Sequence, residues 1–479
     1  MIYFIAAFLR FLNLGTAQLW YDEAFTYLVT KQDLPTMMSA IMGDVHPPLY
    51  YLLMAPIAHL GLNEFFLRLP SVLLSLLAIW LTGQLASQLG LTRRAALIGQ
   101  AIMALLPLQV YHGQEMRMYA LLTALLLAWL LLVLQRRWVW AALVGTLALY
   151  THNYALLYLP IIGLIGLSQE IHRPVILDPK RLTMDWVLGD EANLKGWLLS
   201  VGLPTLLWLP WQIVLLSQMH FVSASYWLPP ITPGGVVFVI VQLFWMVYPP
   251  AGFASVLAVL VTLSLLGWSV IRSHRLAAWR VLILMGFGPL ALAILFSLVW
   301  QPILLYRGLI ASVPMWCLLI AAAMDSLPRL KLAYVVAMGL PLLVGGLVNY
   351  YTQMPIDKGL VLQDIATLTA KWEPGDLLLH SNASTYLPWA AYRPDLPQMV
   401  LPTCGANGGE ISENTRKAIN AYTADSPATR IWFIWDTGPT TPECETTRAE
   451  KLTNGVVPVV TLTDTPYVFR GLYLIEATQ

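Results

Sequence analysis

Ionisable side chains gather in one short stretch near the start of a chain that is otherwise mostly apolar. Asp22 and Glu23 come directly after an apolar run and an aromatic pair, and Asp44 and His46 follow further along. The two prolines after His46 fix the backbone and remove two amide donors, so they should hold the imidazole at the start of a helix. Charged groups held against lipid tend to be functional, so this stretch is a candidate active site. The alternative is an acidic interfacial loop with aromatic anchors.

Three further polar groups are expected at the same membrane face. The first contains Glu115, Arg117 and Tyr119, the second contains His152, and the third contains Arg307. Glu115 and Arg117 are two residues apart, so they would not face each other on a helix, and each could point into a cavity. The alternatives are that His152 is an interfacial hydrogen-bonding residue and that the Arg307 guanidinium snorkels to lipid phosphates.

Carboxylates and cations on one face suit the displacement of a lipid-linked phosphate. Cations would neutralise the leaving phosphate, and a carboxylate would take the proton from an incoming hydroxyl group. Apolar helices would hold the lipid tail.

The composition indicates that membrane-spanning helices position these groups. Of the 479 residues, 58% are hydrophobic and 11% are charged, whereas soluble domains have about 25% charged residues. The 19 tryptophans and 21 tyrosines are typical of a multi-span protein with aromatic belts. A net charge of +1 gives no indication of a basic surface that would bind nucleic acid.

Apolar runs predict about eleven transmembrane helices. The runs are 2–14, 69–89, 95–111, 118–135, 138–151, 153–170, 196–216, 251–272, 281–300, 303–323 and 332–350. A further run, 235–249, has the length of a re-entrant or interfacial helix. Basic residues then fall on one side, in loops at 93–94, 136–137, 173–195, 272–280 and 329–331. The positive-inside rule makes that side cytoplasmic, so the candidate site and the C-terminal residues should lie outside.

The composition changes near Gln353, which predicts a transmembrane domain at 1–352 and a small extracytoplasmic α/β domain at 353–479. Strands are expected at 377–380 and 430–435, with helical spacing over 357–371. Cys404 and Cys444 fall in this second domain. They could form a disulfide or remain two free thiols.

Four motifs occur in series along the membrane part. They are Tyr21-Asp22-Glu23, Asp44 to Tyr50, Arg68 to Ser71, and Gln114 to Leu121. This series resembles the bacterial GT-C glycosyltransferases, which include relatives of dolichyl-phosphate-mannose protein mannosyltransferases and of the lipid A aminoarabinose transferase. The resemblance covers about residues 1–350. The C-terminal domain looks like the variable tail of such proteins.

The resemblance implies transfer of a sugar, usually with inversion, from a polyprenyl phosphate to a hydroxyl group of a protein, lipid or glycan. The reaction would take place on the outer side of a bacterial plasma membrane. Asp22 would be the general base that activates the acceptor hydroxyl, and Glu23 would support or orient it. Asp44 would be a second loop carboxylate that steers acceptor or sugar.

The resemblance also implies how the donor is bound. Arg117 and Arg307 would hold the phosphate, and His46 stands where the aminoarabinose branch has a lysine. Some relatives bind a divalent metal, and Asp44 with His46 could do so, although two ligands are too few to assign a metal. Further candidate substrate contacts are Tyr21, Glu115, Tyr119 and His152.

A lipid-linked sugar flippase or transporter is the alternative function. Such a protein would be expected to have polar residues in mid-span and interrupted helices in matching halves. Here the polar residues gather at one face and no two-fold repeat is apparent, which favours the enzyme. A third possible function is that of a surface assembly protein without catalytic activity.

Overall fold

The computed structural model describes residues 1–61, 63–170, 194–223, 228–245, 253–357, 361–401, 430–437, 460–464 and 469–476. Most of the basic loop expected at 173–195 lies outside these residues, as do Cys404 and Cys444 with their predicted pairing. The chain divides into two compact units, one of Met1–Gly15 and Asp33–Gln353 and one of Thr16–Gln32 and Met354–Gln479. The grouping of residues 16–32 with the C-terminal residues was not predicted from the sequence.

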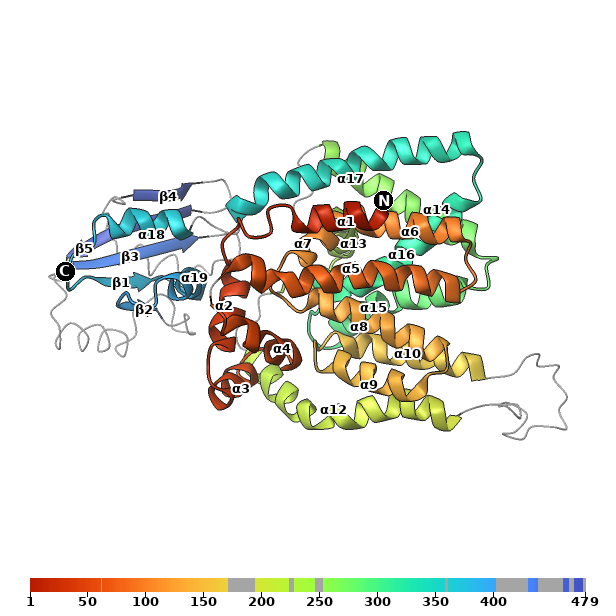
Figure 1. Cartoon of the computed structure of the whole chain (residues 1–479), viewed down its shortest axis with the longest axis horizontal. Helices are drawn as coiled ribbons and strands as arrows, with labels where there is room; N and C mark the ends of the chain where they lie inside the picture. Colours follow the sequence, from red (N-terminus) through yellow and green to blue (C-terminus); the bar gives the residue numbers. More distant parts are fainter. Residues whose placement is uncertain are drawn as a thin grey trace. The chain divides into compact units, whose positions relative to one another are not determined.

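The first unit is built of helices, and most of its long helices run alongside one another (Figure 1). Its elements are α1 (Ile2–Phe11), α3 (Leu34–Met42), α4 (Leu49–Ala58), α5 (Glu64–Gln88), α6 (Arg93–Leu105), α7 (Pro107–Gly113), α8 (Tyr119–Leu134), α9 (Trp138–Leu149), α10 (Ala155–Glu170), α12 (Leu194–Ser223), α13 (Pro233–Trp245), α14 (Phe253–Ser273), α15 (Trp279–Val299), the 3-10 helix η1 (Tyr306–Ser312), α16 (Val313–Asp325) and α17 (Arg329–Asp357).

Helix length and composition identify a multi-span membrane protein. Within the described ranges, six helices are long and apolar enough to cross a membrane, or seven if α6 and α7 form one bent span. This is fewer than the eleven predicted spans. Four of the predicted runs contain only the shorter helices α1, α8, α9 and α10, because apolar sequence continues through the turns that end a helix.

A break in the predicted run 95–111 has a clear local cause. α6 and α7 meet at a bend of 64°. Pro107 disfavours helical geometry in the residue before it, and Leu106 is extended, with φ −62° and ψ 121°. The apolar pattern continues across the proline, so periodicity alone did not reveal the bend.

Buried polar side chains tie the helices of the first unit together. Arg10 is fully buried in α1 and donates to Ser75 Oγ at 2.7 Å. Gln114 donates to the carbonyl oxygens of Arg10 and Leu12, and it accepts from the Tyr350 hydroxyl at 2.6 Å. Backbone and side-chain polar groups need such partners in apolar surroundings. These bonds fix α1 and α17 against the segment that precedes Arg117.

Three of the predicted basic loops lie together at one end of this unit. Thr92 Oγ1 donates to Asp325 Oδ2 at 2.8 Å, and Arg94 forms an ion pair with the same carboxylate at 3.7 Å. Arg272 Nε donates to Ser326 Oγ at 3.1 Å. The connections α5–α6, α14–α15 and α16–α17 therefore meet at one end, as the charge distribution predicts.

The second unit contains a small mixed sheet. Its elements are α2 (Tyr21–Thr30), α18 (Val361–Thr369), β1 (Leu377–His380), α19 (Ala383–Tyr392), β2 (Gln398–Val400), β3 (Arg430–Thr437), β4 (Val460–Asp464) and β5 (Phe469–Glu476). The strand order is β2-β1-β3-β5-β4. β1 is parallel to β2 and β3, whereas β5 is antiparallel to β3 and β4. The predicted strands at 377–380 and 430–435 are confirmed as β1 and β3, and α18 lies within the predicted helical segment.

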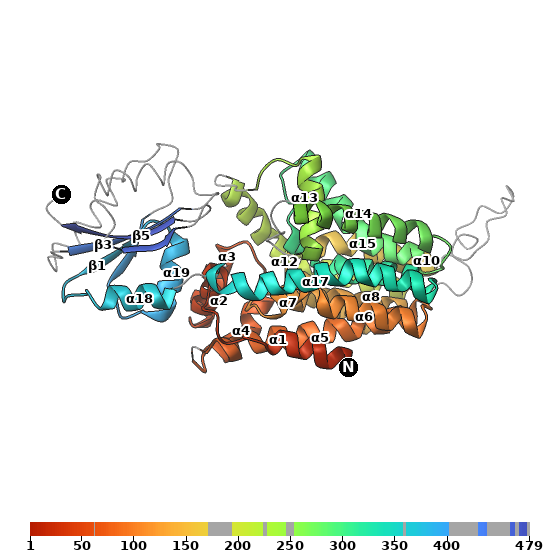
Figure 2. The same cartoon turned by 90° about the horizontal axis from the view of Figure 1, so that it is seen from above.

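Alternating strand residues build two apolar layers in this unit. Leu378 and Trp432 pack in one cluster with residues of α18 and α19, which cover one face of the sheet (Figure 2). Their neighbours Leu379 and Phe433 belong to a separate cluster. This follows from the two-residue period of a strand, which sends successive side chains to opposite faces. α2 packs against α19, so the acidic helix belongs to this unit.

Candidate functional site

The loop between α3 and α4 carries Asp44 and His46, and two anchors hold it in place. The Asn153 side-chain amide donates through Nδ2 to the Val45 carbonyl at 2.9 Å. Gln218 Nε2, from α12, donates to carbonyls in the last turn of α3 at 3.1 and 3.3 Å. α4 begins directly after the two prolines. The loop is thus fixed by the turn between α9 and α10 and by α12, both distant in the sequence.

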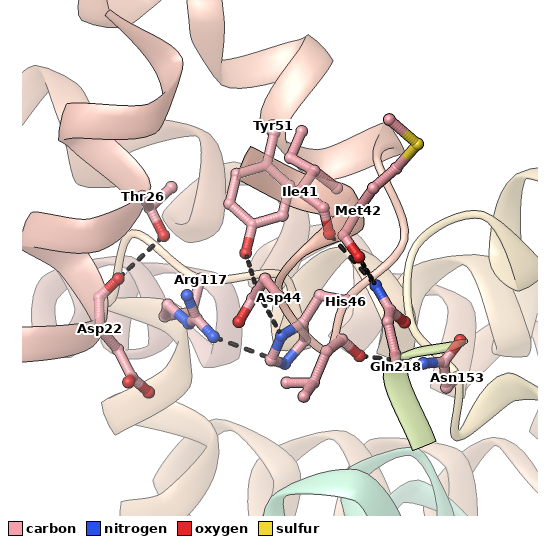
Figure 3. Close-up of polar contacts among 11 residues, drawn as sticks. Asp22, Thr26, Ile41, Met42, Asp44, His46, Tyr51, Arg117, Asn153 and Gln218 are labelled. Atoms are coloured by element: carbon pink, nitrogen blue, oxygen red, sulfur yellow. Dashed lines mark hydrogen bonds and ion pairs between the residues drawn. The ribbon is translucent and has the colours of Figure 1, made fainter. Parts of the chain in front are cut away.

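Asp44, His46 and Arg117 come together from two of the four sequence motifs (Figure 3). His46 Nδ1 lies 3.1 Å from Asp44 Oδ2, and the Tyr51 hydroxyl donates to the same oxygen at 3.0 Å. Arg117 Nη2 lies 3.5 Å from His46 Nε2. Arg117 and His46 are both buried. The structure therefore joins a carboxylate, an imidazole and a guanidinium in one hydrogen-bonded row.

Aromatic and imidazole rings pack one against the next, starting at His46. The His46 and His152 rings meet edge to face with centroids 5.0 Å apart. Tyr119 lies 5.8 Å from His152 and 4.5 Å from His112, again between centroids. His112 Nδ1 contacts Glu115 Oε2 at 2.7 Å, and both side chains are buried. Of the candidate substrate contacts, His152 therefore lies beside His46 and Tyr119 lies beside His152, whereas Glu115 contacts His112.

Arg307 is positioned by η1 and by Tyr154. The Tyr154 hydroxyl donates to the carbonyl oxygen of Ile303, just before η1. A Cβ atom at position 308 would collide with the Tyr154 ring. Only glycine permits this approach, so Gly308 lets the turn carrying Arg307 lie directly against Tyr154.

His46, His152 and Arg307 line a cavity of about 720 Å³, a size within the usual range for small-molecule sites. Most of its wall is apolar. The other lining residues are Val45, Tyr119, Asn153, Tyr154, Leu156, Leu157, Trp208, Gln212, Leu215, Leu216, Gln218, Met219, Leu228, Phe296, Trp300, Gln301, Ile303 and Leu305. A cavity with one cationic side chain and an apolar wall can accommodate an anionic head attached to a hydrocarbon chain.

Burial and nearby cations control the charge of the two histidines. Burial lowers the pKa of His46, and the Arg117 and Arg307 guanidiniums lower it further, against the opposing hydrogen bond with Asp44. Burial lowers the pKa of His152 well below its ordinary value, and His46 and both arginines add to this effect. Burial acts to raise the pKa of Asp44, but its hydrogen bond with His46 and the Arg117 charge outweigh this, so the pKa is lowered. At neutral pH the imidazoles are therefore neutral and Asp44 is ionised.

Asp22, Glu23 and Tyr21 lie in the first turn of α2, in the second unit. Negative charge is favoured at a helix N-terminus. The Thr26 hydroxyl donates to the Asp22 carbonyl oxygen at 2.9 Å (Figure 3). Glu23 is buried and Tyr21 is exposed. The predicted catalytic carboxylates thus come from two units, with Asp44 in the first.

Tyr51, Asn153 and Gln218 contact or anchor the loop of Asp44 and His46 but were not predicted as site residues. Asn153 adjoins His152 in the turn between α9 and α10, which was the available sequence signal. Gln218 stands in a long apolar helix, and Tyr51 is one of several aromatic residues in its segment. Their roles depend on helix packing, which sequence spacing does not specify.

A metal centre was left open for Asp44 and His46. These two side chains contact each other directly. Across the described ranges, no group of three or more histidine, cysteine, aspartate or glutamate side chains is placed to hold a metal ion.

The chain matches known proteins in structure but not in sequence. No family model matches the chain, and no curated protein matches it by sequence. ArnT from Cupriavidus metallidurans in the apo state matches 98% of this chain and 97% of its own length, with a TM-score of 0.61 and 13% identity. The chain has the GT-C fold. This GT-C match confirms the resemblance inferred from the four motifs.

Two further structures share the GT-C fold. ArnT bound to undecaprenyl phosphate matches with a TM-score of 0.59 and 13% identity over 98% of this chain and 97% of that one. The Archaeoglobus fulgidus oligosaccharyltransferase in the apo form matches with a TM-score of 0.50 and 12% identity, over 90% of this chain and 68% of that one.

Proposed function

We propose that this protein is a membrane glycosyltransferase that transfers a sugar from a polyprenyl phosphate to a hydroxyl acceptor. The observation that carries the proposal is Arg307 in the wall of a largely apolar cavity, next to the row formed by His46 and Arg117. A guanidinium is always charged and binds phosphate oxygens through two parallel hydrogen bonds. The apolar wall would take the first part of the lipid tail.

The GT-C fold supports the same ligand class. ArnT from Cupriavidus metallidurans has been seen bound to undecaprenyl phosphate. We infer that the present chain also takes a polyprenyl phosphate carrying a sugar. The acceptor could be a protein, a lipid or a glycan, and each would supply the hydroxyl oxygen that attacks the sugar.

The proposed reaction is a single displacement with inversion. The acceptor oxygen forms a bond to the anomeric carbon while the bond from that carbon to the phosphate oxygen breaks. Asp22 takes the acceptor proton and Glu23 supports it. Arg117 and Arg307 stabilise the negative charge that develops on the leaving lipid phosphate. Asp44 holds His46 and steers the acceptor or sugar.

The proposed setting is the inner (plasma) membrane of a bacterium, with the active site and the C-terminal domain, residues 353–479, on the extracytoplasmic side. The basic loops that meet at one end of the helical unit would then be cytoplasmic. The proposed topology has eleven spans, in which the shorter helices α1, α8, α9 and α10 also cross the membrane.

A donor survey tests this function. Purified protein in nanodiscs is given radiolabelled mannosyl, glucosyl or aminoarabinosyl polyprenyl phosphates together with native membrane extract as the acceptor source. We expect label from one donor to appear on a protein, lipid or glycan, and Asp22→Asn to abolish transfer. Asp33→Asn is the matched control, because Asp33 caps α3 through the Thr36 amide.

Two results would contradict the proposal. If Asp22→Asn transferred sugar at the wild-type rate, Asp22 could not be the general base. Label that crosses the bilayer of proteoliposomes without being transferred to any acceptor would instead support the flippase.

A further inference from the structure

Three polar atoms around the cavity have no hydrogen-bond partner among the residues that the structure describes. They are Asn153 Oδ1, Gln218 Oε1 and Trp208 Nε1, and all three are buried. Their residues line the same cavity. Buried polar atoms without partners are rare in proteins, because each loses its bonds to water and gains none in exchange. Three in one cavity wall indicate a polar ligand.

The two amide oxygens are fixed as acceptors by the bonds that the amide nitrogens make. Asn153 Nδ2 donates to the Val45 carbonyl, and Gln218 Nε2 donates to the Ile41 carbonyl. A rotation that exchanged nitrogen and oxygen would place two acceptors against each other. Figure 3 shows both amides beside the loop of His46. The cavity therefore presents two fixed acceptors and one indole donor near the imidazole.

The charges around the cavity restrict the ligand further. Its described lining contains Arg307 and no aspartate or glutamate. The Asp44 carboxylate is not part of this lining, and its Oδ2 accepts from His46 and Tyr51. With the lipid phosphate paired to Arg307, an ammonium group on the sugar would have no carboxylate in the described cavity wall to pair with. Hydroxyl groups can satisfy both acceptors and the indole donor without adding charge.

We propose that Asn153, Gln218 and Trp208 bind hydroxyl groups of the donor sugar, and that this sugar is neutral and does not carry an amino group. This inference rests on the proposed function, because it places the sugar next to the lipid phosphate held by Arg307. Each amide oxygen accepts from a sugar hydroxyl, and the indole N–H donates to a hydroxyl oxygen. A site built to bind hydroxyl groups discriminates strongly against ligands that leave its polar atoms unpaired.

Competition binding without acceptor tests the inference. Radiolabelled undecaprenyl phosphate is displaced from wild-type protein by unlabelled undecaprenyl phosphate and by its glucosyl, mannosyl and aminoarabinosyl derivatives. We expect one neutral derivative to bind about tenfold more tightly than bare undecaprenyl phosphate, which corresponds to one or two net hydrogen bonds. The aminoarabinosyl derivative should gain nothing over the bare lipid.

Substitution of a polar residue in the cavity wall should remove affinity that the sugar adds to the donor. A residue that makes no other bond should do so without changing the affinity for the lipid phosphate. Trp208→Phe should lower affinity for the neutral derivative by about fivefold to tenfold, with unchanged affinity for undecaprenyl phosphate. Gln218→Leu should lower affinity for the neutral derivative by at least as much, and it should also weaken lipid phosphate binding, because it removes the bonds that hold the loop of His46. Ser217→Ala is the matched control, since Ser217 is exposed on the same helix and is not part of the cavity lining.

The outcomes separate this inference from the proposed function. If undecaprenyl phosphate does not bind, the proposed function fails. If it binds but the neutral sugars add nothing, or the aminoarabinosyl derivative binds most tightly, the neutral-sugar site is wrong. Unchanged neutral-sugar binding in both Gln218→Leu and Trp208→Phe would also overturn it. Retained binding of bare undecaprenyl phosphate shows that a variant is folded.

Discussion

His46 and Asp44 contact each other through Nδ1 and Oδ2 at 3.1 Å, and this contact belongs to a row that sets the tautomer of the imidazole. Arg117 Nη2 can only donate, and it lies 3.5 Å from Nε2 of the same ring. Nε2 therefore accepts, and Nδ1 carries the proton that it donates to Asp44. A ring with one proton is neutral, in agreement with the lowered pKa of His46. The positive charge at the site comes from the arginines.

The neutral state of both histidines predicts a pH dependence of stability. The unfolded chain binds protons at histidine near pH 6.5, whereas the folded chain binds them at His46 and His152 only at lower pH. The free energy of unfolding is therefore fully retained above pH 6.5 and falls as the pH decreases toward the folded pKa values. Thermal unfolding followed by tryptophan fluorescence should show this slope, and His152→Gln should reduce it. An unchanged slope in that variant would contradict the prediction for His152.

Arg307→Ala should weaken binding of undecaprenyl phosphate by about tenfold or more, because a charge-assisted phosphate contact is lost. Arg307→Lys should recover only part of the affinity, since an ammonium cannot form the two parallel bonds of a guanidinium. The displacement assay described above gives both values. Arg94→Ala is the control, because Arg94 is exposed and pairs with Asp325. Equal affinity in Arg307→Ala and wild type would remove Arg307 from the phosphate site.

Gly308→Ala should lower donor affinity although the substitution adds only a methyl group. The new Cβ would collide with the Tyr154 ring, so either that ring or the turn of Arg307 must move. Overpacking of this kind destabilises proteins by about 1–3 kcal/mol. Thermal unfolding and lipid phosphate binding should both decline. Gly267→Ala is the comparison, since no atom lies within 4 Å of a Cβ at that position, and wild-type behaviour of Gly308→Ala would refute the packing argument.

Asp376→Ala should loosen the sheet of the second unit without affecting lipid phosphate binding. Asp376 Oδ2 accepts from Trp432 Nε1 at 2.7 Å and from the Glu373 amide at 2.9 Å, and the residue is buried. Unpaired buried donors destabilise by about 1–3 kcal/mol each. Hydrogen exchange in the full chain should become faster in β1 and β3. Asp395→Ala is the control, because that carboxylate is exposed in its ion pair with Arg393 and should contribute less than about 1 kcal/mol.

By itself, the sequence determined the class of fold and most of the charged site. Apolar runs separated by basic loops predicted a multi-span helical unit, because only helices satisfy their own backbone in lipid. Composition after Gln353 predicted a small α/β unit, and its strands β1 and β3 lie at the short apolar runs that predicted strands at 377–380 and 430–435. The motifs pointed to Asp44, His46 and Arg117, and the chain does bring these three together.

Only the tertiary structure decided which uncharged side chains surround that site and which distant segments pack together. Gln218 and Asn153 are ordinary polar residues in the sequence, and only helix packing turns their oxygens toward one cavity. The grouping of residues 16–32 with the C-terminal unit arises from contacts such as Leu19 N to the Tyr392 hydroxyl. Local periodicity reports which face of a helix is apolar, but it does not report which distant residue will cover that face.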